Sequence, residues 1–254
     1  MAKINMQKGK RGQITIFIIL AILIVASLLI YFLWIQPAMT NQTGKLKLDN
    51  CISDALETEI PDLAENAGLL NPKFTYQYMG QNITYVCYTD EYYQPCIVQE
   101  PFLLNTFETS LEKSMRQRVQ ACYDGAIEQL RAEGYEVKSG EIKTQVLIQP
   151  TLVEVNIEAP TTITKESSQQ FRQIKVTQNS QLYEILMIAT SLLQYETAYG
   201  DTDTTSSMFF YPDIIIDKMK RSDGTTVYTV ESKTEEIKFK FASRSYAWPA
   251  GYGI

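Results

Sequence analysis

The feature that most constrains this chain is an uncharged apolar run over residues 14–35, in which only Thr15 and Ser27 are clearly polar. A helix of this length extends about 33 Å, which matches the hydrocarbon core of a bilayer. A cleaved secretory signal has a shorter apolar run, of roughly 7–15 residues, followed by small residues. Here the run ends in aromatic residues. It therefore predicts a retained transmembrane helix over residues 13–35, with the lipid bilayer as its partner.

Charge is distributed unevenly along the chain. Residues 1–12 carry four basic and no acidic side chains, a formal charge of +4. Because the net charge of the whole chain is −6, the remaining residues have a formal charge of −10. Basic residues flank transmembrane helices on the cytoplasmic side. We therefore expect residues 1–12 in the cytoplasm and the C-terminal domain outside the cell. Nucleic acid is not an expected partner, because an acidic body is repelled by phosphate.

The start of the apolar run carries a recognisable motif. Residues 10–17 read KRGQITIF, a basic stretch that ends in Gly12 and Gln13 immediately before the apolar residues. This resembles the class III leader of archaeal type IV pilin-like proteins, and also the start of archaeal membrane-anchored surface proteins. The resemblance covers about residues 8–35. It implies proteolytic processing between Gly12 and Gln13.

Two residues depart from the pilin pattern. Pilins carry a glutamate at the fifth position after the cleavage site, where this chain has Phe17. Pilin helices also continue beyond the membrane, whereas Pro37 and the polar residues after it predict a break. We therefore favour a simple anchor over a filament subunit, and the pilin-like subunit remains the alternative.

All four cysteines follow the apolar run. An even number in an exported domain indicates two disulfide bonds, for which three connectivities exist. Cys87 and Cys96 flank a short polar and aromatic loop, whereas Cys51 and Cys122 each lie in a helical pattern. We favour the pairs Cys51 with Cys122 and Cys87 with Cys96. A zinc site is not expected, because the chain has no C-x-x-C spacing.

The sequence predicts a linker over residues 36–45 and an extracytoplasmic domain over residues 46–254. Apolar residues recur at helical spacing in three segments, and alternate as in strands in several others. The expected helices are 46–70, in which Pro61 is a possible break, 101–133 and 179–199. The expected strands are 74–79, 83–88, 141–148, 152–159, 209–216, 225–230 and 236–242, with a further extended stretch over 161–176. Without regular βαβ alternation, the fold class is α+β, mainly antiparallel.

Tyrosine is concentrated in the hairpin expected over residues 74–88. These rings are expected either to form an adhesive outer surface or to pair across the strands and stabilise a short sheet. Asn41 and Asn82 each begin an N-x-T triplet, the acceptor pattern for glycosylation in an exported domain.

Catalytic signals are weak. The chain contains no histidine, the commonest general base and a frequent zinc ligand. Asp201 and Asp203 are the best candidates for an ion site, but the residues that follow them do not complete a calcium loop, so a solvated loop over 200–207 is favoured. No nucleotide-binding glycine loop occurs, and no cofactor or metal is expected.

The favoured function is a non-enzymatic, single-pass surface protein with a structural or adhesive role. Its expected partners are other surface proteins or copies of itself. An anchored hydrolase is a more distant alternative, in which Asp213 or Asp217 would act with a glutamate elsewhere in the chain.

Overall fold

The computed structural model describes residues 19–27 and 46–249, in a chain that divides into two units, Met1–Leu46 and Lys47–Ile254. In the first unit residues 19–27 form a helix whose large apolar side chains are at least half exposed. Within 19–27 and 46–249, no helix has both the length and the apolar character needed to cross a bilayer. The expected processing site at Gly12 and Gln13, the linker 36–45 and Asn41 lie outside the described residues.

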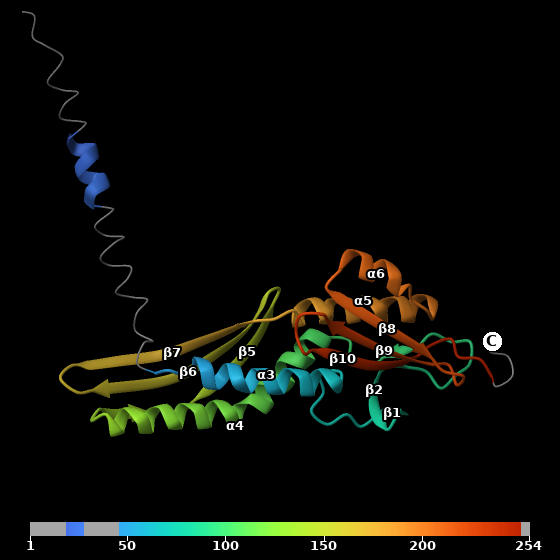
Figure 1. Ribbon diagram of the computed structural model, residues 1–254, viewed down its shortest axis with the longest axis horizontal. Helices are drawn as coiled ribbons and strands as arrows, with labels where there is room; N and C mark the ends of the chain where they lie inside the picture. The colour runs from blue at the N-terminus through green and yellow to red at the C-terminus, as the bar shows by residue number, and fades with distance from the viewer. Residues whose placement is uncertain (1–18, 28–45, 250–254) are drawn as a thin grey trace, which may run out of the picture. The chain divides into compact units, whose positions relative to one another are not determined.

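The second unit is a mixed α+β domain (Figure 1). Its helices are α3 (Asp49–Glu65), α4 (Leu103–Ala132), α5 (Leu182–Tyr199) and α6 (Thr204–Phe210). Its strands are β1 (Thr75–Tyr78), β2 (Gln81–Tyr88), β3 (Ile97–Val98), β4 (Glu136–Ser139), β5 (Lys143–Gln149), β6 (Leu152–Thr164), β7 (Ser168–Asn179), β8 (Ile214–Lys220), β9 (Thr225–Ser232) and β10 (Lys238–Arg244).

The strands of this unit form two sheets. One has the order β1-β2-β10-β9-β8, with β3 paired to β2, and its β2–β10 pairing is parallel while its other pairings are antiparallel. In the other sheet, β4 and β5 pair with successive parts of β6, and β7 pairs along the length of β6. The fold is therefore α+β with mainly antiparallel sheets, as the sequence predicts.

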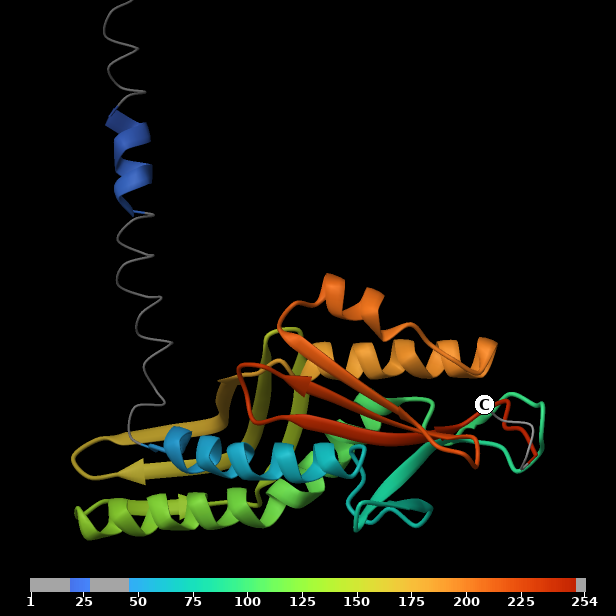
Figure 2. The ribbon, with the colours of Figure 1, turned by 45° about the vertical axis from the view of Figure 1, so that its right-hand side comes forward.

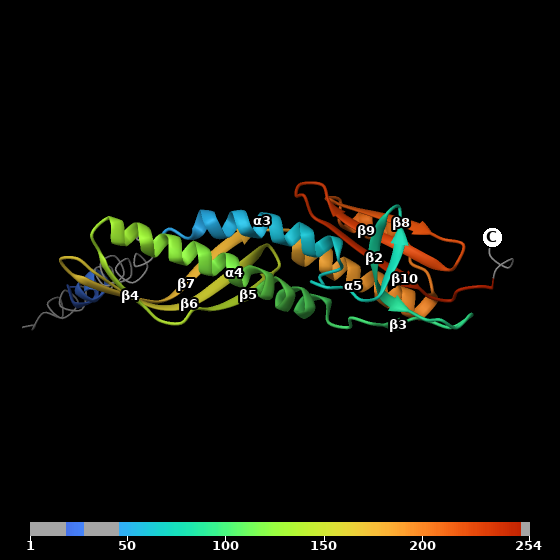
Figure 3. The same cartoon turned by 90° about the horizontal axis from the view of Figure 1, so that it is seen from below.

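The helices bury apolar stripes against the sheets and against one another. In α4 a stripe at intervals of three or four residues is buried: Leu103, Phe107, Leu111, Met115, Val119, Tyr123, Ile127 and Leu130. This helix contacts α3 and β5, and α3 also contacts β7 and β10. Helix α5 packs on β9, β10 and β2 of the larger sheet, as Figure 2 shows. Within this unit, Figures 1 and 3 place the two sheets toward opposite ends.

Two disulfide bonds link the cysteines of this unit in the pairing expected from the sequence. Cys51 of α3 is bonded to Cys122 of α4, a separation of 71 residues along the chain. Cys87 of β2 is bonded to Cys96, which closes the loop between β2 and β3 over 9 residues. The first bond joins two neighbouring helices, and the second fixes a surface loop.

The structure corrects several expected elements. The segment assigned to a loop and the start of a strand contains α6, and β8 begins only at Ile214. Asp203 caps the N-terminus of α6, because its carboxylate accepts hydrogen bonds from the Thr205 N–H over 2.9 Å and from the Ser206 hydroxyl over 2.7 Å. Pro61 does not break α3, which continues to Glu65. Two short strands, β3 and β4, were not expected.

Candidate binding site

A hollow lined by aromatic and charged side chains lies on the larger sheet. It has a cavity volume of about 360 Å³ and is lined by Phe74, Tyr85, Tyr88, Asp90, Tyr92, Ser222, Asp223, Arg244 and Trp248. We call it the aromatic hollow. Its walls come from β2, the disulfide-closed loop, the β8–β9 turn, the end of β10 and the segment after it. The loop and the last segment lie at the end of this unit opposite the first turn of α3 (Figures 1 and 3).

Ring-to-ring contacts hold the floor of the aromatic hollow together. The Phe74 ring stacks on Tyr85 with centroids 4.8 Å apart and meets Tyr88 edge-on at 4.6 Å. Tyr85 is buried, and its hydroxyl is hydrogen-bonded to Thr225 over 2.8 Å. Such contacts add to the stabilisation that comes from burial alone. The floor is therefore a packed, preformed surface.

Arg244 supplies the positive charge of the aromatic hollow. Its Nε donates to the Asp223 carbonyl over 3.1 Å, and its Nη1 donates to the Thr89 carbonyl. The guanidinium carbon lies 5.9 Å from the Tyr88 ring centroid and 5.6 Å from that of Tyr92. These contacts use two of the five N–H groups of the guanidinium. The remaining N–H groups have no hydrogen-bond partner among residues 19–27 and 46–249.

The two carboxylates of the aromatic hollow have acceptor capacity to spare. Asp223 accepts the Thr225 N–H over 2.9 Å through Oδ1. Its Oδ2, and both oxygens of the exposed Asp90, have no hydrogen bond or ion pair within the described part of the chain. A carboxylate can accept about four hydrogen bonds. Most of this capacity faces solvent in the structure.

The loops that carry the aromatic hollow are tied to the sheet. Backbone N–H groups connect Thr89 to Arg244 over 3.1 Å and Tyr93 to Ala247 over 2.9 Å, and Tyr246 binds back to Gln94 over 2.8 Å. Tyr93 and Tyr246 have φ angles of 59° and 46°, which bulky residues rarely adopt. Such conformations persist where the surrounding structure imposes them, and they cluster at functional sites.

Gly224 sets the distance between two walls of the aromatic hollow. Its φ is 87°, and a Cβ on this residue would lie 2.4 Å from the Ala247 Cβ. We therefore expect Gly224→Ala to lower the free energy of unfolding by about 2 kcal/mol, through backbone strain and this clash. Chemical denaturation of the full chain in detergent measures the change.

Gly125 provides the matched control for this substitution. It lies within α4, is exposed, and a Cβ there would have no heavy atom within 4 Å. Gly125→Ala is therefore expected to stabilise the protein by about 0.5–1 kcal/mol, because alanine favours the helix. Equal effects of the two substitutions would contradict the close approach of Gly224 to Ala247.

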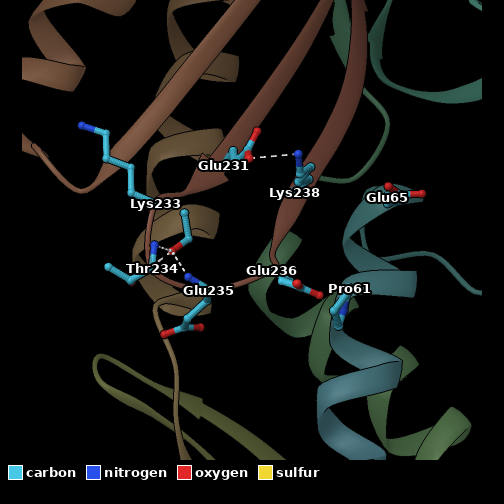
Figure 4. Close-up of a pocket in the computed structure, with 9 residues that line it drawn as sticks. Pro61, Glu65, Glu231, Lys233, Thr234, Glu235, Glu236 and Lys238 are labelled. Carbon is cyan, nitrogen blue, oxygen red and sulfur yellow. Dashed lines mark hydrogen bonds and ion pairs between the residues drawn. The ribbon is translucent and has the colours of Figure 1, made fainter.

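A second hollow lies between α3 and the turn that joins β9 to β10 (Figure 4). Its cavity volume is about 480 Å³, and glutamate and lysine dominate its lining. Three of the glutamates are already bound: Glu231 pairs with Lys238 over 2.9 Å, Glu65 with Lys240 over 2.9 Å, and Glu235 accepts the Gln181 N–H over 2.9 Å. Most of the carboxylates in this hollow are therefore already held by ion pairs or hydrogen bonds within the chain. An adjoining one of about 390 Å³ shares Pro61, Glu235 and Glu236 with it.

Glu196 of α5 is fully buried, and both of its carboxyl oxygens are hydrogen-bonded. Tyr228 of β9 donates to one oxygen, and Ser243 of β10 donates to the other over 3.0 Å. The Ser245 hydroxyl donates to the Glu196 carbonyl over 2.8 Å and accepts the Cys96 N–H over 3.0 Å. These contacts join α5 to the sheet and to the disulfide-closed loop. Glu196 lines none of the three hollows.

Burial raises the pKa of the Glu196 carboxyl above its usual value, and the hydrogen bonds from Tyr228 and Ser243 offset part of this increase. Burial and the nearby Glu196 also raise the pKa of the Tyr228 phenol. The second buried carboxylate within 19–27 and 46–249, Glu154, behaves differently. Its hydrogen bond with Lys175 lowers its pKa. Each buried acid therefore has its own partners.

The candidate ion-site residues do not form a joint site. Asp201 is ion-paired with Lys218 and with Lys220, the latter over 2.7 Å, whereas the Asp203 carboxylate caps α6. No group of three acidic or cysteine side chains suited to a metal occurs within 19–27 and 46–249. Asp213 and Asp217 are exposed and line none of the three hollows. Asn82 is exposed at the start of β2.

The structure shows the cross-strand packing expected for the tyrosine-rich hairpin, whereas an adhesive role of its surface stays a prediction. Tyr76 packs edge-on against Tyr85 at 5.9 Å, and both rings belong to the cluster around Ile83, Val227 and Ala242. The aromatic hollow beside this hairpin is also lined by residues from the C-terminal third of the chain. In the sequence these residues are isolated aromatic and charged positions in turns, and their spacing along the chain does not indicate that they lie together.

Comparison of the chain with protein-family models, with curated proteins and with solved structures found no match in any of the three searches.

Proposed function

We propose that this chain is a single-pass membrane-anchored surface protein whose second unit makes non-enzymatic contacts outside the cell. The observation that carries the proposal is that both disulfide bonds lie in the unit that follows the apolar run. Disulfide bonds persist in extracellular and other oxidising compartments and are rare in the cytosol. The positive flank before the apolar run supports the same orientation.

Further support for an anchor comes from residues 19–27. Their apolar side chains are exposed in the helix that they form, with exposed fractions between 51% for Ile24 and 63% for Leu23. Burying these side chains in lipid would be favourable by about 25 cal/mol for each Å² of apolar surface. The aromatic hollow then gives the second unit a preformed surface for contact with a partner.

The anchor predicts that two arginines in the apolar run will release the protein from the membrane. We expect Leu23→Arg with Ala26→Arg to move most of the chain from the membrane fraction to the soluble fraction. The reason is that each arginine costs roughly 2.5–3.5 kcal/mol near the centre of a spanning helix. Fractionation of cells, followed by quantification of the protein, measures the shift.

The control is Leu23→Ile with Ala26→Val, which keeps the run apolar and should leave the protein in the membrane fraction. An epitope tag placed after Ile254 reports the orientation. Protease added to intact cells should remove the tag, and a tag that is cleaved only after lysis would contradict the proposed location of the second unit.

A second candidate is a pilin-like filament subunit processed between Gly12 and Gln13, which the motif at residues 10–17 favours. The intact mass of the mature protein separates the two. A mass that lacks residues 1–12, together with filaments in electron micrographs, would support the pilin-like subunit. A mass that retains these residues would support the simple anchor.

A further inference from the structure

The aromatic hollow offers apolar ring faces beside unused hydrogen-bonding groups. Phe74, Tyr92 and Trp248 are 44%, 48% and 53% exposed. Next to them lie the Arg244 guanidinium and the carboxylates of Asp90 and Asp223, whose spare donors and acceptors are described above. A ligand for this surface therefore needs a flat apolar face, surrounded by groups that both donate and accept hydrogen bonds.

The charges of the aromatic hollow disfavour ionic ligands. Two carboxylates against one guanidinium repel an anion such as phosphate. An ammonium ligand would normally be held over the aromatic faces. Here Arg244 already lies over the Tyr88 and Tyr92 rings, and its charge repels a second cation. A neutral ligand fits this surface best.

Sugar rings have this combination of properties. One face of a pyranose exposes C–H groups that pack on aromatic rings, while hydroxyl groups around its rim donate and accept hydrogen bonds. The volume of about 360 Å³ is at the lower end of the roughly 300–1,000 Å³ of small-molecule sites. We propose that the aromatic hollow binds a neutral saccharide, as one or two sugar units of a surface glycan. This inference rests on the proposed function, because such a glycan lies outside the cell.

The framework around the aromatic hollow favours binding, because little has to be ordered. The disulfide bond between Cys87 and Cys96 fixes the loop that carries Asp90 and Tyr92. The Ala247 carbonyl accepts the Tyr93 N–H, which holds the backbone just before Trp248. The Trp248 ring packs edge-on against the Tyr93 ring, with centroids 5.2 Å apart. Preorganised sites lose less conformational entropy on binding. The bound and free states are therefore expected to have the same backbone.

Trp248 makes the test direct, because the chain has only two tryptophans. In a Trp34→Phe background, Trp248 is the sole indole, and it lies in the aromatic hollow. The full chain, purified in a detergent without a sugar headgroup, is titrated with a panel of neutral hexose and N-acetylhexosamine oligosaccharides. We expect at least one of them to change the Trp248 emission in a saturable manner.

Two variants and one control locate the binding. Tyr92→Ala and Asp223→Asn should each weaken the affinity about tenfold or more, as expected for the loss of an aromatic anchor and of a hydrogen bond to a charged carboxylate. Tyr199→Ala removes a ring of α5 that is 73% exposed and outside the aromatic hollow, so it should leave the affinity unchanged. Circular dichroism confirms that each variant is folded.

The possible results have distinct meanings. If no neutral oligosaccharide gives a saturable change, or if Tyr199→Ala weakens binding as much as Tyr92→Ala, the saccharide assignment is overturned. Binding only to charged sugars or to peptides would also overturn it. None of these results affects the proposed anchor, which fractionation and tag accessibility test separately.

Discussion

Replacing Cys51 and Cys122 together by serine is expected to lower the free energy of unfolding by about 4 kcal/mol. The bond closes a loop of 71 residues, and removing it restores the conformational entropy of that loop to the unfolded chain. Unfolding of the full chain in detergent, followed by circular dichroism in increasing denaturant, measures the difference.

The second disulfide bond provides the comparison. Cys87 and Cys96 close only 9 residues, so their replacement by serine is expected to cost about 2.5 kcal/mol by the same relation. The loop-entropy account would be wrong if the short-loop variant lost as much stability as the long-loop variant. Both variants are measured under oxidising conditions, so that the remaining bond stays intact.

The second large effect concerns pH. Because burial raises the pKa of Glu196 in the folded state, the folded protein holds this proton more tightly than the unfolded chain does. Stability from this group is therefore full below the usual value of 4.5 and falls as pH rises through the folded pKa. The loss amounts to about 1.4 kcal/mol for each pH unit by which the folded pKa exceeds the usual value.

Glu196→Gln isolates this contribution, because glutamine keeps the shape and stays neutral. We expect the stability of the variant, relative to the wild type, to increase between pH 4.5 and neutral pH. Tyr228, Lys218 and Asp201 act on Glu196 in the wild type and are unchanged in the variant. The carboxyls of Glu154, Asp201 and Asp203, whose pKa values are lowered, are also common to both proteins. Parallel pH profiles would contradict the raised pKa of Glu196.

Local periodicity predicts most helices and strands of the second unit. In α4 the apolar residues recur every three or four positions, which requires one buried face, and burial follows this pattern. In β6 Val153, Val155 and Ile157 are buried as the alternation predicts, but Glu154 and Asn156 between them are buried as well. Helix α6 does not follow such a pattern, because none of its residues is buried and Phe209 and Phe210 point into solvent. Its signal is the Asp203 cap, which is local but short.

The aromatic hollow was beyond prediction for a different physical reason. Tyr88 and Arg244 are 156 positions apart in the chain, and they meet because β2 and β10 pair in parallel. Parallel strands are not joined by a short hairpin turn, so no local sequence pattern indicates that they pair. The disulfide bond between Cys87 and Cys96 was within reach, because its loop is short and polar. The Glu196 network was not, since a glutamate near a helix end normally indicates a solvated position.

The position of β10 in the larger sheet has a consequence for the order of folding. This strand lies between β2 and β9, so β2 lacks its principal neighbour until residues 238–244 have been synthesised. Contacts between such distant segments form slowly, because a long loop must be closed first. On a ribosome or in transit across a membrane, the smaller sheet and the α3–α4 pair contain all their residues earlier. Residues 75–78 and 97–98 supply β1 and β3 as early partners of β2, so the nascent chain needs protection mainly along the edge of β2 that later pairs with β10.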